Sequence, residues 1–145
     1  LIYFVEDDYL HFENSLNDMI NTYERISSQI NKDIIVCPCD YPYNYMTNKK
    51  TNILIGSNQH WQTITKILCT FIISKKMLDK YWDNLKKTCE KRHDPFEKYL
   101  NEILVNEIGI SPINTLSVHL ANVNSSYGLS PFVNIKKLWE ENKVY

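Results

Sequence analysis

Three consecutive acidic residues follow an apolar segment at the start of the chain. Leu1–Val5 is apolar at every position and leads directly into Glu6, Asp7 and Asp8. An unbroken apolar run is typical of a strand buried on both faces of a parallel sheet, and ligands bind at the carboxyl ends of such strands. Adjacent carboxylates repel one another, and a divalent cation that prefers oxygen ligands relieves this repulsion. The triplet therefore predicts a metal site, with the alternative that Asp7 or Asp8 only caps the following helix.

A helix and a second strand are predicted to position this triplet. Apolar side chains recur at three- and four-residue intervals between Phe12 and Ile30, which is the period of a helix with one buried face. The apolar run Ile34–Cys37 then predicts a second buried strand. A strand, a helix and a strand in this order form a right-handed unit with parallel strands. We therefore expect the acidic triplet at the carboxyl edge of a sheet.

The whole sequence predicts one α/β domain over residues 1–145, with a mixed, mainly parallel sheet flanked by helices. Residues 38–52 are rich in Pro, Tyr and Asn without periodicity and predict a long surface loop that carries Tyr41, Tyr43 and Tyr45. The other predicted elements are a hairpin at Ile53–Ile55 and His60–Thr65, strands at Cys69–Ser74 and Ile113–Val118, and helices at Lys76–Thr88, Pro95–Asn106 and Val133–Glu141.

The composition indicates a globular domain without a strong charge footprint. Of the 145 residues, 43% are hydrophobic and 12% aromatic, which allows a core of ordinary size. The 16 basic and 17 acidic residues give a formal net charge of -1, so we expect no nucleic-acid partner. No membrane segment or targeting peptide is recognisable in this sequence, and this favours a cytoplasmic location.

The four cysteines predict buried thiols rather than a zinc site. Cys37 and Cys39 are separated by one residue, not by the two of a zinc knuckle, and Cys69 and Cys89 stand singly. Free cysteines are among the most frequently buried residues in proteins.

Four segments, taken together in their order and spacing, carry a resemblance to a known family. They are Tyr3–His11 with the acidic triplet, His60–Phe71, His93–Glu97 and Leu116–Pro131. With these segments, most of the chain resembles the catalytic, C-terminal part of a GT-A type nucleotide-sugar glycosyltransferase. Because Leu1 is not a methionine and the chain opens inside a predicted strand, we expect the family's N-terminal nucleotide-binding units to precede it. This fragment alone need not be active.

The resemblance implies a transferase that moves a sugar from a nucleotide-diphosphate donor to a hydroxyl of a carbohydrate or other acceptor. Glu6, Asp7 and Asp8 match the family's DxD-like motif and would bind the donor, with Asp8 on the metal and Asp7 facing the sugar or ribose. His119 matches a distant histidine that often binds the same ion. Carboxylate and imidazole ligands suit Mn²⁺ as well as Mg²⁺. Taken alone, His119 is better explained as a hydrogen-bonded structural residue.

The resemblance also places a catalytic base at the start of a helix after the central strands. An inverting transfer needs a carboxylate that takes the proton of the acceptor hydroxyl. Asp94 and Glu97 are so placed, and Asp94 is preferred although Pro95 directly after it departs from the family pattern. Without catalysis, Asp94 is explained as a helix cap and Glu97 as a first-turn charge that complements the helix dipole.

His60 and Trp61 form a candidate aromatic wall for a sugar acceptor, because flat apolar rings with polar rims suit a carbohydrate face. Packing of Trp61 in the core explains this residue equally well. Trp82 and Trp139 fall on the apolar faces of predicted helices, so we expect both to pack inside. Leu129–Pro131 belongs to a loop that can fold over a bound donor.

Two other functions compete with the transferase. A phosphoreceiver domain also opens with an apolar strand and a magnesium-binding acidic pair, but it needs an acid at the end of its central strand. Asp40 comes too early for this role, and Ile53–Ile55 ends without an acid. The other alternative is a non-catalytic carbohydrate-binding or scaffold domain with a transferase-like fold. Such a domain would keep these motifs but would not transfer a sugar.

Overall fold

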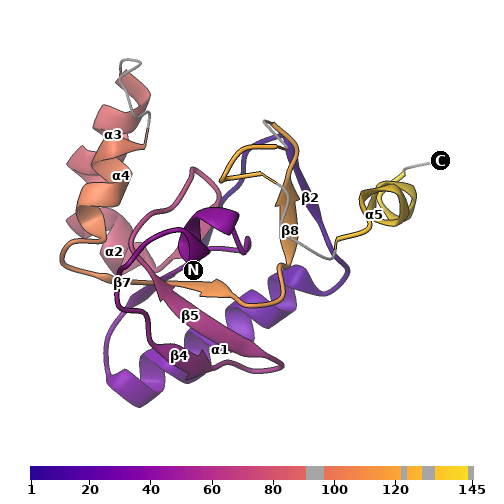
Figure 1. Cartoon of the computed structure of the whole chain (residues 1–145). Helices are drawn as coiled ribbons and strands as arrows, with labels where there is room; N and C mark the ends of the chain where they lie inside the picture. Colours follow the sequence, from indigo (N-terminus) through magenta and orange to yellow (C-terminus); the bar gives the residue numbers. More distant parts are fainter. Residues whose placement is uncertain (91–96, 122–123, 129–132, 144–145) are drawn as a thin grey trace.

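The structure, a computed structural model, describes residues 1–90, 97–121, 124–128 and 133–143. A six-stranded sheet forms its centre, and a two-stranded sheet stands beside it (Figure 1). In sheet order the six strands are β1 (Ile2–Phe4), β6 (Phe71–Ile73), β3 (Ile34–Val36), β7 (Ile108–Pro112), β5 (His60–Ile64) and β4 (Ile53–Ile55). The small sheet pairs β2 (Tyr9–His11) with β8 (Ser117–His119) in the antiparallel sense.

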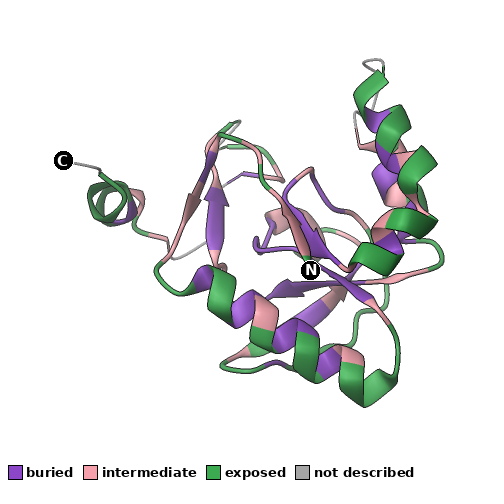
Figure 2. Ribbon diagram, turned by 180° about the vertical axis from the view of Figure 1, so that it is seen from behind, coloured by how far each residue is buried: buried purple, intermediate pink, exposed green. Residues whose placement is uncertain are grey.

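Helices flank the large sheet on both faces, as predicted for an α/β fold with a mixed sheet. They are α1 (Ser15–Ile30), α2 (Lys75–Lys80), α3 (Trp82–Glu90), α4 (Lys98–Ile103) and α5 (Ile135–Glu141), with a short 3-10 helix at Pro42–Tyr45. α1 lies along one face of the sheet with buried and exposed residues alternating along it (Figure 2), and its buried residues share a core cluster with strand residues. α2, α3 and α4 pack on the other face. α5 packs against β2, away from the large sheet (Figure 1). No helix within the described residues is long and apolar enough to cross a membrane.

The central strand β3 has a core on each of its faces, and this explains its unbroken apolar sequence. Successive side chains of a strand point to opposite faces of the sheet. Ile34 and Val36 pack on the α1 side in one cluster with Met19, and all three are fully buried. Ile35 packs on the opposite side in the cluster that contains Leu100 of α4. The prediction of a buried strand at this position is confirmed.

β1 is an edge strand, and the prediction that its segment is buried on both faces is wrong. The strand pairs with β6, its residues are of intermediate exposure, and Leu1 and Val5 on either side are about half exposed. β1 runs in the same direction as β3, as expected for a strand, helix and strand unit, but β6 lies between them. An apolar run indicates that a segment tends to be buried, but it does not indicate where the strand lies in the sheet.

The sheet is mixed but not mainly parallel, which corrects the prediction. Among the described strands, β3 and β7 form a parallel pair, whereas the β1–β6, β6–β3, β7–β5 and β5–β4 pairs are antiparallel. The β4–β5 hairpin was predicted, but its insertion next to β7 was not. The antiparallel pairs also separate this fold from the parallel doubly wound sheet of a phosphoreceiver domain.

The sequence patterns did not predict two of the strands, β7 and β2. β7 contains Gly109 and Pro112, which are both unusual inside strands. Gly109 is closely packed, since a Cβ atom built there would lie 2.6 Å from Cδ2 of Leu104, whose side chain would have to shift. β2 has three residues only and follows the acidic triplet directly, where a helix start was predicted.

The strand directions bring three connecting segments to one edge of the large sheet. β1, β3 and β7 run the same way, so their carboxyl ends meet at that edge. The acidic triplet follows β1, Cys37–Asp40 follows β3, and residues 113–116 lead from β7 into β8. Backbone hydrogen bonds join these segments, because the N–H of Leu116 donates to the carbonyl of Pro38 and that of Phe12 to the carbonyl of Leu116.

Trp61 of β5 is a core residue of the α1 face. Its side chain is 0% exposed and belongs to the cluster formed by α1, β3 and β7. The ring passes so close to Gly56 that a Cβ atom there would lie 2.3 Å from it. Trp82 and Trp139, by contrast, are 56% and 50% exposed, so the prediction that both pack inside is wrong. In α5 the buried position belongs to Leu138 instead.

We predict that Trp61→Ala lowers the free energy of unfolding by about 3–5 kcal/mol, because it leaves a large cavity between α1 and the sheet. Trp139→Ala is the matched control and should change it by about 0.5 kcal/mol or less, as is usual for exposed positions. Urea denaturation followed by circular dichroism measures both. Equal effects of the two substitutions would contradict the assignment of Trp61 to the core.

Candidate active site

The structure brings Asp8 and His119 into contact across the small sheet. Tyr9 of β2 is paired in register with His119 of β8, and the N–H of Leu120 donates to the carbonyl oxygen of Asp8. The side chains on the two strands therefore meet, with Nε2 of His119 3.1 Å from Oδ2 of Asp8. The side chain of His119 is 14% exposed and that of Asp8 is 36% exposed, so a ligand can reach the pair from solvent.

Two contacts fix the orientation of the His119 ring. The ring of Tyr9 stacks on it with a centroid distance of 4.8 Å and an interplanar angle of 18°. Nδ1 lies 3.2 Å from the carbonyl oxygen of Tyr127, which can only accept a hydrogen bond, so Nδ1 carries a hydrogen. Nε2 is thereby directed at Asp8. Histidine ligands of metal ions are held in the same way, through a hydrogen bond from the other ring nitrogen to a carbonyl or carboxylate.

One carboxylate oxygen of Asp8 is buried without a hydrogen-bond partner among the described residues. Oδ2 faces His119, whereas Oδ1 is buried and has no hydrogen-bond partner among the described residues. A buried carboxylate oxygen without a partner is costly and calls for an explanation. Adjacent ligands of an octahedral ion with bond lengths of about 2.1 Å lie about 3.0 Å apart, close to the 3.1 Å between Nε2 and Oδ2. The same 3.1 Å is an ordinary hydrogen-bond distance between an imidazole nitrogen and a carboxylate oxygen, and it also leaves both side chains close enough to bind one cation.

Protein side chains do not fill the coordination sphere of such an ion in the described part of the chain. No group of three or more His, Cys, Asp and Glu side chains is arranged there to hold a metal. Mg²⁺ commonly binds through one or two carboxylates and completes its sphere with water and substrate phosphates. The donor set of Asp8 and His119 suits this kind of site, in which the ligand supplies part of the coordination.

The other acids of the triplet differ in environment. Burial raises the pKa of Glu6, and the neighbouring charge of Asp8 raises it further. The backbone N–H of Glu6 donates to Oγ1 of the fully buried Thr70, at 3.0 Å, which holds the triplet to the start of β6. Asp7 is exposed. The triplet therefore combines a half-buried acid, a solvent-facing acid and the partner of His119.

Glu97 lies near the acidic triplet, and Asp94 lies outside the described residues. The charge of Glu97 acts on the carboxyl group of Glu6, on the thiol of Cys69 and on the phenol of Tyr127. Glu97 occupies the N-cap position of α4, but its side chain makes no capping hydrogen bond. A charge at the start of α4 agrees with the explanation of Glu97 as a complement to the helix dipole, and its effect on Glu6 places it near the triplet.

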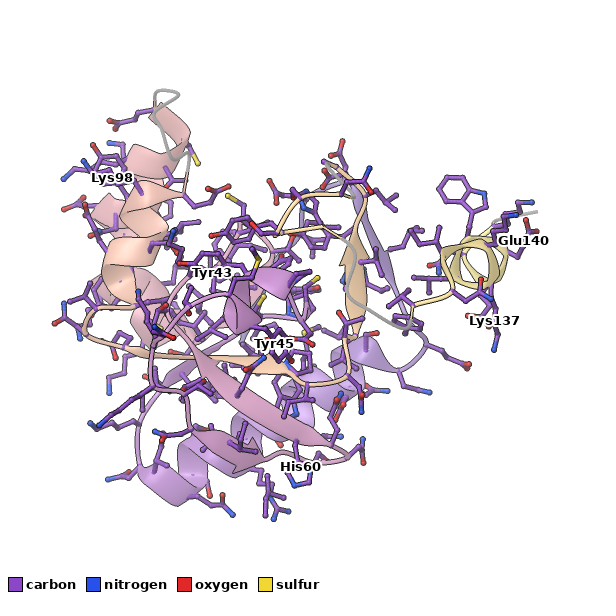
Figure 3. All side chains as sticks on the ribbon, viewed as in Figure 1. Tyr43, Tyr45, His60, Lys98, Lys137 and Glu140 are labelled. Atoms are coloured by element: carbon purple, nitrogen blue, oxygen red, sulfur yellow. The ribbon has the colours of Figure 1, made fainter. Side chains whose placement is uncertain are left out.

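His60 and Trp61 do not form a wall of this site, which corrects the predicted acceptor site. Trp61 is fully buried beneath α1 and can contact no acceptor. His60 is exposed near the turn of the β4–β5 hairpin, whereas Tyr43 lies toward the middle of the molecule (Figure 3). A tryptophan next to a polar residue in a strand gives the same sequence signal whether its ring faces the core or solvent.

Four tyrosines of the core on the α2–α4 side of the sheet pack next to His119. The hydroxyl groups of Tyr9 and Tyr41 are 2.7 Å apart, and the rings of Tyr41 and Tyr127 meet edge to face at 5.7 Å. Tyr43 stacks on Tyr127 with a centroid distance of 5.0 Å. We call Tyr9, Tyr41, Tyr43 and Tyr127 the tyrosine wall. The loop over residues 38–52 is thus partly internal, since Tyr41 is buried, and no sequence signal linked it to Tyr127.

Comparisons of the chain with known protein families, with curated proteins and with solved structures found no match.

The cysteines divide into buried and accessible thiols. Cys37 and Cys39 are buried, as predicted, and Sγ of Cys39 donates to the carbonyl oxygen of Ser117 at 3.1 Å. Burial raises the pKa of the Cys37 and Cys69 thiols to about 12. The prediction of a buried thiol is wrong for Cys89, which is exposed near the end of α3, and Cys69 is only partly buried.

We predict that iodoacetamide at pH 8 modifies Cys89 in the native protein and leaves Cys37, Cys39 and Cys69 unmodified. The thiolate is the reactive form, and at pH 8 a thiol with a pKa near 12 stays protonated. Mass spectrometry of tryptic peptides identifies the modified residues. Denaturation in guanidinium chloride should expose all four, and rapid native modification of Cys37 would contradict the described packing.

Proposed function

We propose that this protein is a metal-dependent glycosyltransferase that moves a sugar from a nucleotide-diphosphate donor to a hydroxyl of a carbohydrate or other acceptor. The observation that carries the proposal is the contact between Asp8 and His119, which are distant in sequence and close enough to bind one cation. The resemblance of the motifs to the GT-A type supplies the reaction class. The location of the pair at the carboxyl edge of the sheet agrees with the usual place of ligand sites in α/β folds.

The chemistry requires stabilisation of the diphosphate that leaves as the glycosidic bond breaks. Mn²⁺ or Mg²⁺ held by Asp8 and His119 would act there as a Lewis acid. His119 contributes a fixed direction, because Tyr9 and the carbonyl oxygen of Tyr127 restrain its ring. Asp7, which is exposed beside Asp8, is the residue that we assign to the donor sugar or ribose. Glu6 holds the triplet against β6 through its backbone.

The acceptor hydroxyl must lose its proton as its oxygen attacks the sugar. A carboxylate within hydrogen-bond reach performs this step in an inverting transfer. Asp94 remains a candidate from the sequence. Glu97 is the second candidate, and its electrostatic effect on Glu6 agrees with a position near the triplet.

We predict that metal and nucleotide bind this site cooperatively. Because Asp8 and His119 supply only part of a coordination sphere, Mn²⁺ should bind the full-length protein at least about tenfold more tightly with UDP or GDP present, and the nucleotide should gain the same factor from Mn²⁺. Isothermal titration calorimetry in both orders measures the two factors.

Asp8→Asn and His119→Gln should remove this coupling and the transfer activity without changing the thermal unfolding temperature by more than a few degrees. Asp83→Asn, an exposed acid of α3, is the matched control and should keep both. If neither nucleotide binds more tightly with metal in the wild-type protein, the transferase proposal is wrong. Cooperative binding without sugar transfer or donor hydrolysis would favour the non-catalytic carbohydrate-binding alternative.

The two candidate bases are distinguished by their effect on the rate. We predict that removal of the true base, by Asp94→Asn or Glu97→Gln, lowers kcat by about 10²–10⁴-fold and leaves metal-dependent nucleotide binding intact. Steady-state assays with both variants measure this. A loss of less than about tenfold for one residue assigns the role to the other, and such a small loss for both would exclude a carboxylate base at this helix start.

A further inference from the structure

β4 is an edge strand whose outer side pairs with no described strand. It stands at one end of the six-stranded sheet and pairs only with β5 (Figure 1). Natural edge strands are commonly protected by a lysine, a proline or a bulge. β4 consists of Ile53, Leu54 and Ile55 in regular register with β5, so it contains none of these devices. Its outer side is therefore open to pairing with another strand.

The hydrogen bonds of the β4–β5 hairpin show which backbone groups of β4 are free. The N–H of Thr63 donates to the carbonyl oxygen of Asn52, and the N–H of Gly56 donates to the carbonyl oxygen of Gln59. Hydrogen-bonded and non-hydrogen-bonded residue pairs alternate along an antiparallel ladder. Residues 52, 54 and 56 therefore face β5, and residues 53 and 55 direct their N–H and carbonyl groups away from it. No backbone group in the described part of the chain pairs with these four outward groups.

Exposed apolar side chains accompany the free groups. Ile53 and Ile55 are 55% and 64% exposed, on the face opposite to the one on which Leu54 packs against the core cluster beneath α1. Gln62 is the register partner of Ile53, and its Nε2 donates to the hydroxyl oxygen of Tyr45 at 3.2 Å. Tyr45 is 59% exposed. The edge therefore offers a partner both hydrogen bonds and apolar surface.

The free groups are arranged symmetrically about Leu54, and this favours a second copy of the chain as the partner. When two β4 strands pair antiparallel about a two-fold axis beside Leu54, Ile53 of each copy lies opposite Ile55 of the other. These are the hydrogen-bonded positions of the new ladder, so all four outward groups of each strand are used. The two Leu54 side chains then meet on the other face, and each apolar side chain has an apolar neighbour.

The charges next to β4 favour the antiparallel arrangement over the parallel one. Lys49 and Lys50 precede the strand, whereas the uncharged Ser57, Asn58 and Gln59 follow it. Antiparallel pairing places the lysines of one copy toward the uncharged end of the other copy. Parallel pairing would place the lysines of both copies side by side, which is unfavourable.

We propose that two copies of the chain associate in solution through antiparallel pairing of their β4 strands. The two six-stranded sheets then form one continuous sheet across the two-fold axis. Because the contact is short, the dimer should be weak and should form at micromolar concentrations. The inference does not depend on the proposed function.

Sedimentation equilibrium of the full-length protein across the micromolar range tests the association. Ile55→Pro removes the outward N–H of Ile55, which β5 does not use, so the hairpin keeps its own ladder. Each dimer then loses two hydrogen bonds, and we expect the dissociation constant to rise by at least about tenfold. Ile55→Leu keeps the N–H and the side-chain volume and is the matched control, with a change within about threefold.

A second pair of variants tests the apolar side chains. Ile53→Lys places a charge opposite Ile55 of the other copy, and it should also weaken the dimer by at least about tenfold. Val105→Lys is its matched control, because Val105 is 80% exposed and lies outside β4, and it should stay within about twofold. Thermal unfolding followed by circular dichroism checks that each variant is folded. If Ile55→Pro is unfolded, Ile53→Lys decides the result.

Disulfide cross-linking tests the register. In a Cys89→Ser background, Leu54→Cys places two thiols in a non-hydrogen-bonded antiparallel pair, where Cα atoms are about 4.5 Å apart and a disulfide fits. With diamide as the oxidant, we expect a dimer on a non-reducing gel that dithiothreitol dissociates. Ile53→Cys in the same background is the matched control. Its two thiols lie two residues out of register, beyond the reach of about 7 Å between Cα atoms, and should cross-link poorly.

A concentration-dependent dimer that Ile55→Pro and Ile53→Lys weaken, with selective cross-linking of Leu54→Cys, supports the inference. A wild-type protein that stays monomeric throughout the concentration range would overturn it. A dimer that both variants leave unchanged, or equal cross-linking at positions 53 and 54, would also overturn it. If the wild type is monomeric but its Ile53 and Ile55 amides are protected from hydrogen exchange, the inference is wrong and β4 pairs with a different strand.

Discussion

The pairing of β2 with β8 is the constraint on which the candidate site depends. These two short strands join the start of the chain to a segment more than a hundred residues later. Their register places Tyr9 opposite His119, and the hydrogen bond from Leu120 to Asp8 continues the ladder by one step. Without this register, Asp8 and His119 would belong to separate loops. Fixed backbone positions give the side-chain contact its precision, as two flexible loops would not.

Several elements of the fold could be predicted from local sequence patterns, because these patterns indicate which faces of a helix or strand are buried. The period of α1, the unbroken apolar run of β3 and the β4–β5 hairpin all follow from this rule. Strand order does not, since it is decided by contacts between distant segments. The apolar runs of β1 and β3 look alike, yet one strand lies at the edge and the other at the centre. β7 was not predicted, because it contains Gly109 and Pro112, which are unusual inside strands. The strand predicted at Ile113–Val118 begins directly after β7 and overlaps only the start of β8.

The charged and titratable residues of the candidate site could be predicted from the sequence. An acidic triplet after a strand and a late histidine are visible in the sequence, and the structure places Asp8 beside His119. The tyrosine wall was not predictable, because its rings come from three separate segments and tyrosines serve in cores and sites alike. For the same reason Trp61 was open to two explanations, and only its burial decided between them.

The C-terminal helix α5 supports the small sheet from its outer side. Leu138 is buried against the rest of the molecule, and the amide of Asn142 donates to the carbonyl oxygen of His11 in β2. The helix stands away from the large sheet (Figure 1). It therefore supports the strand that carries Tyr9, so the geometry of the Asp8–His119 contact depends partly on a segment that contributes no side chain to it.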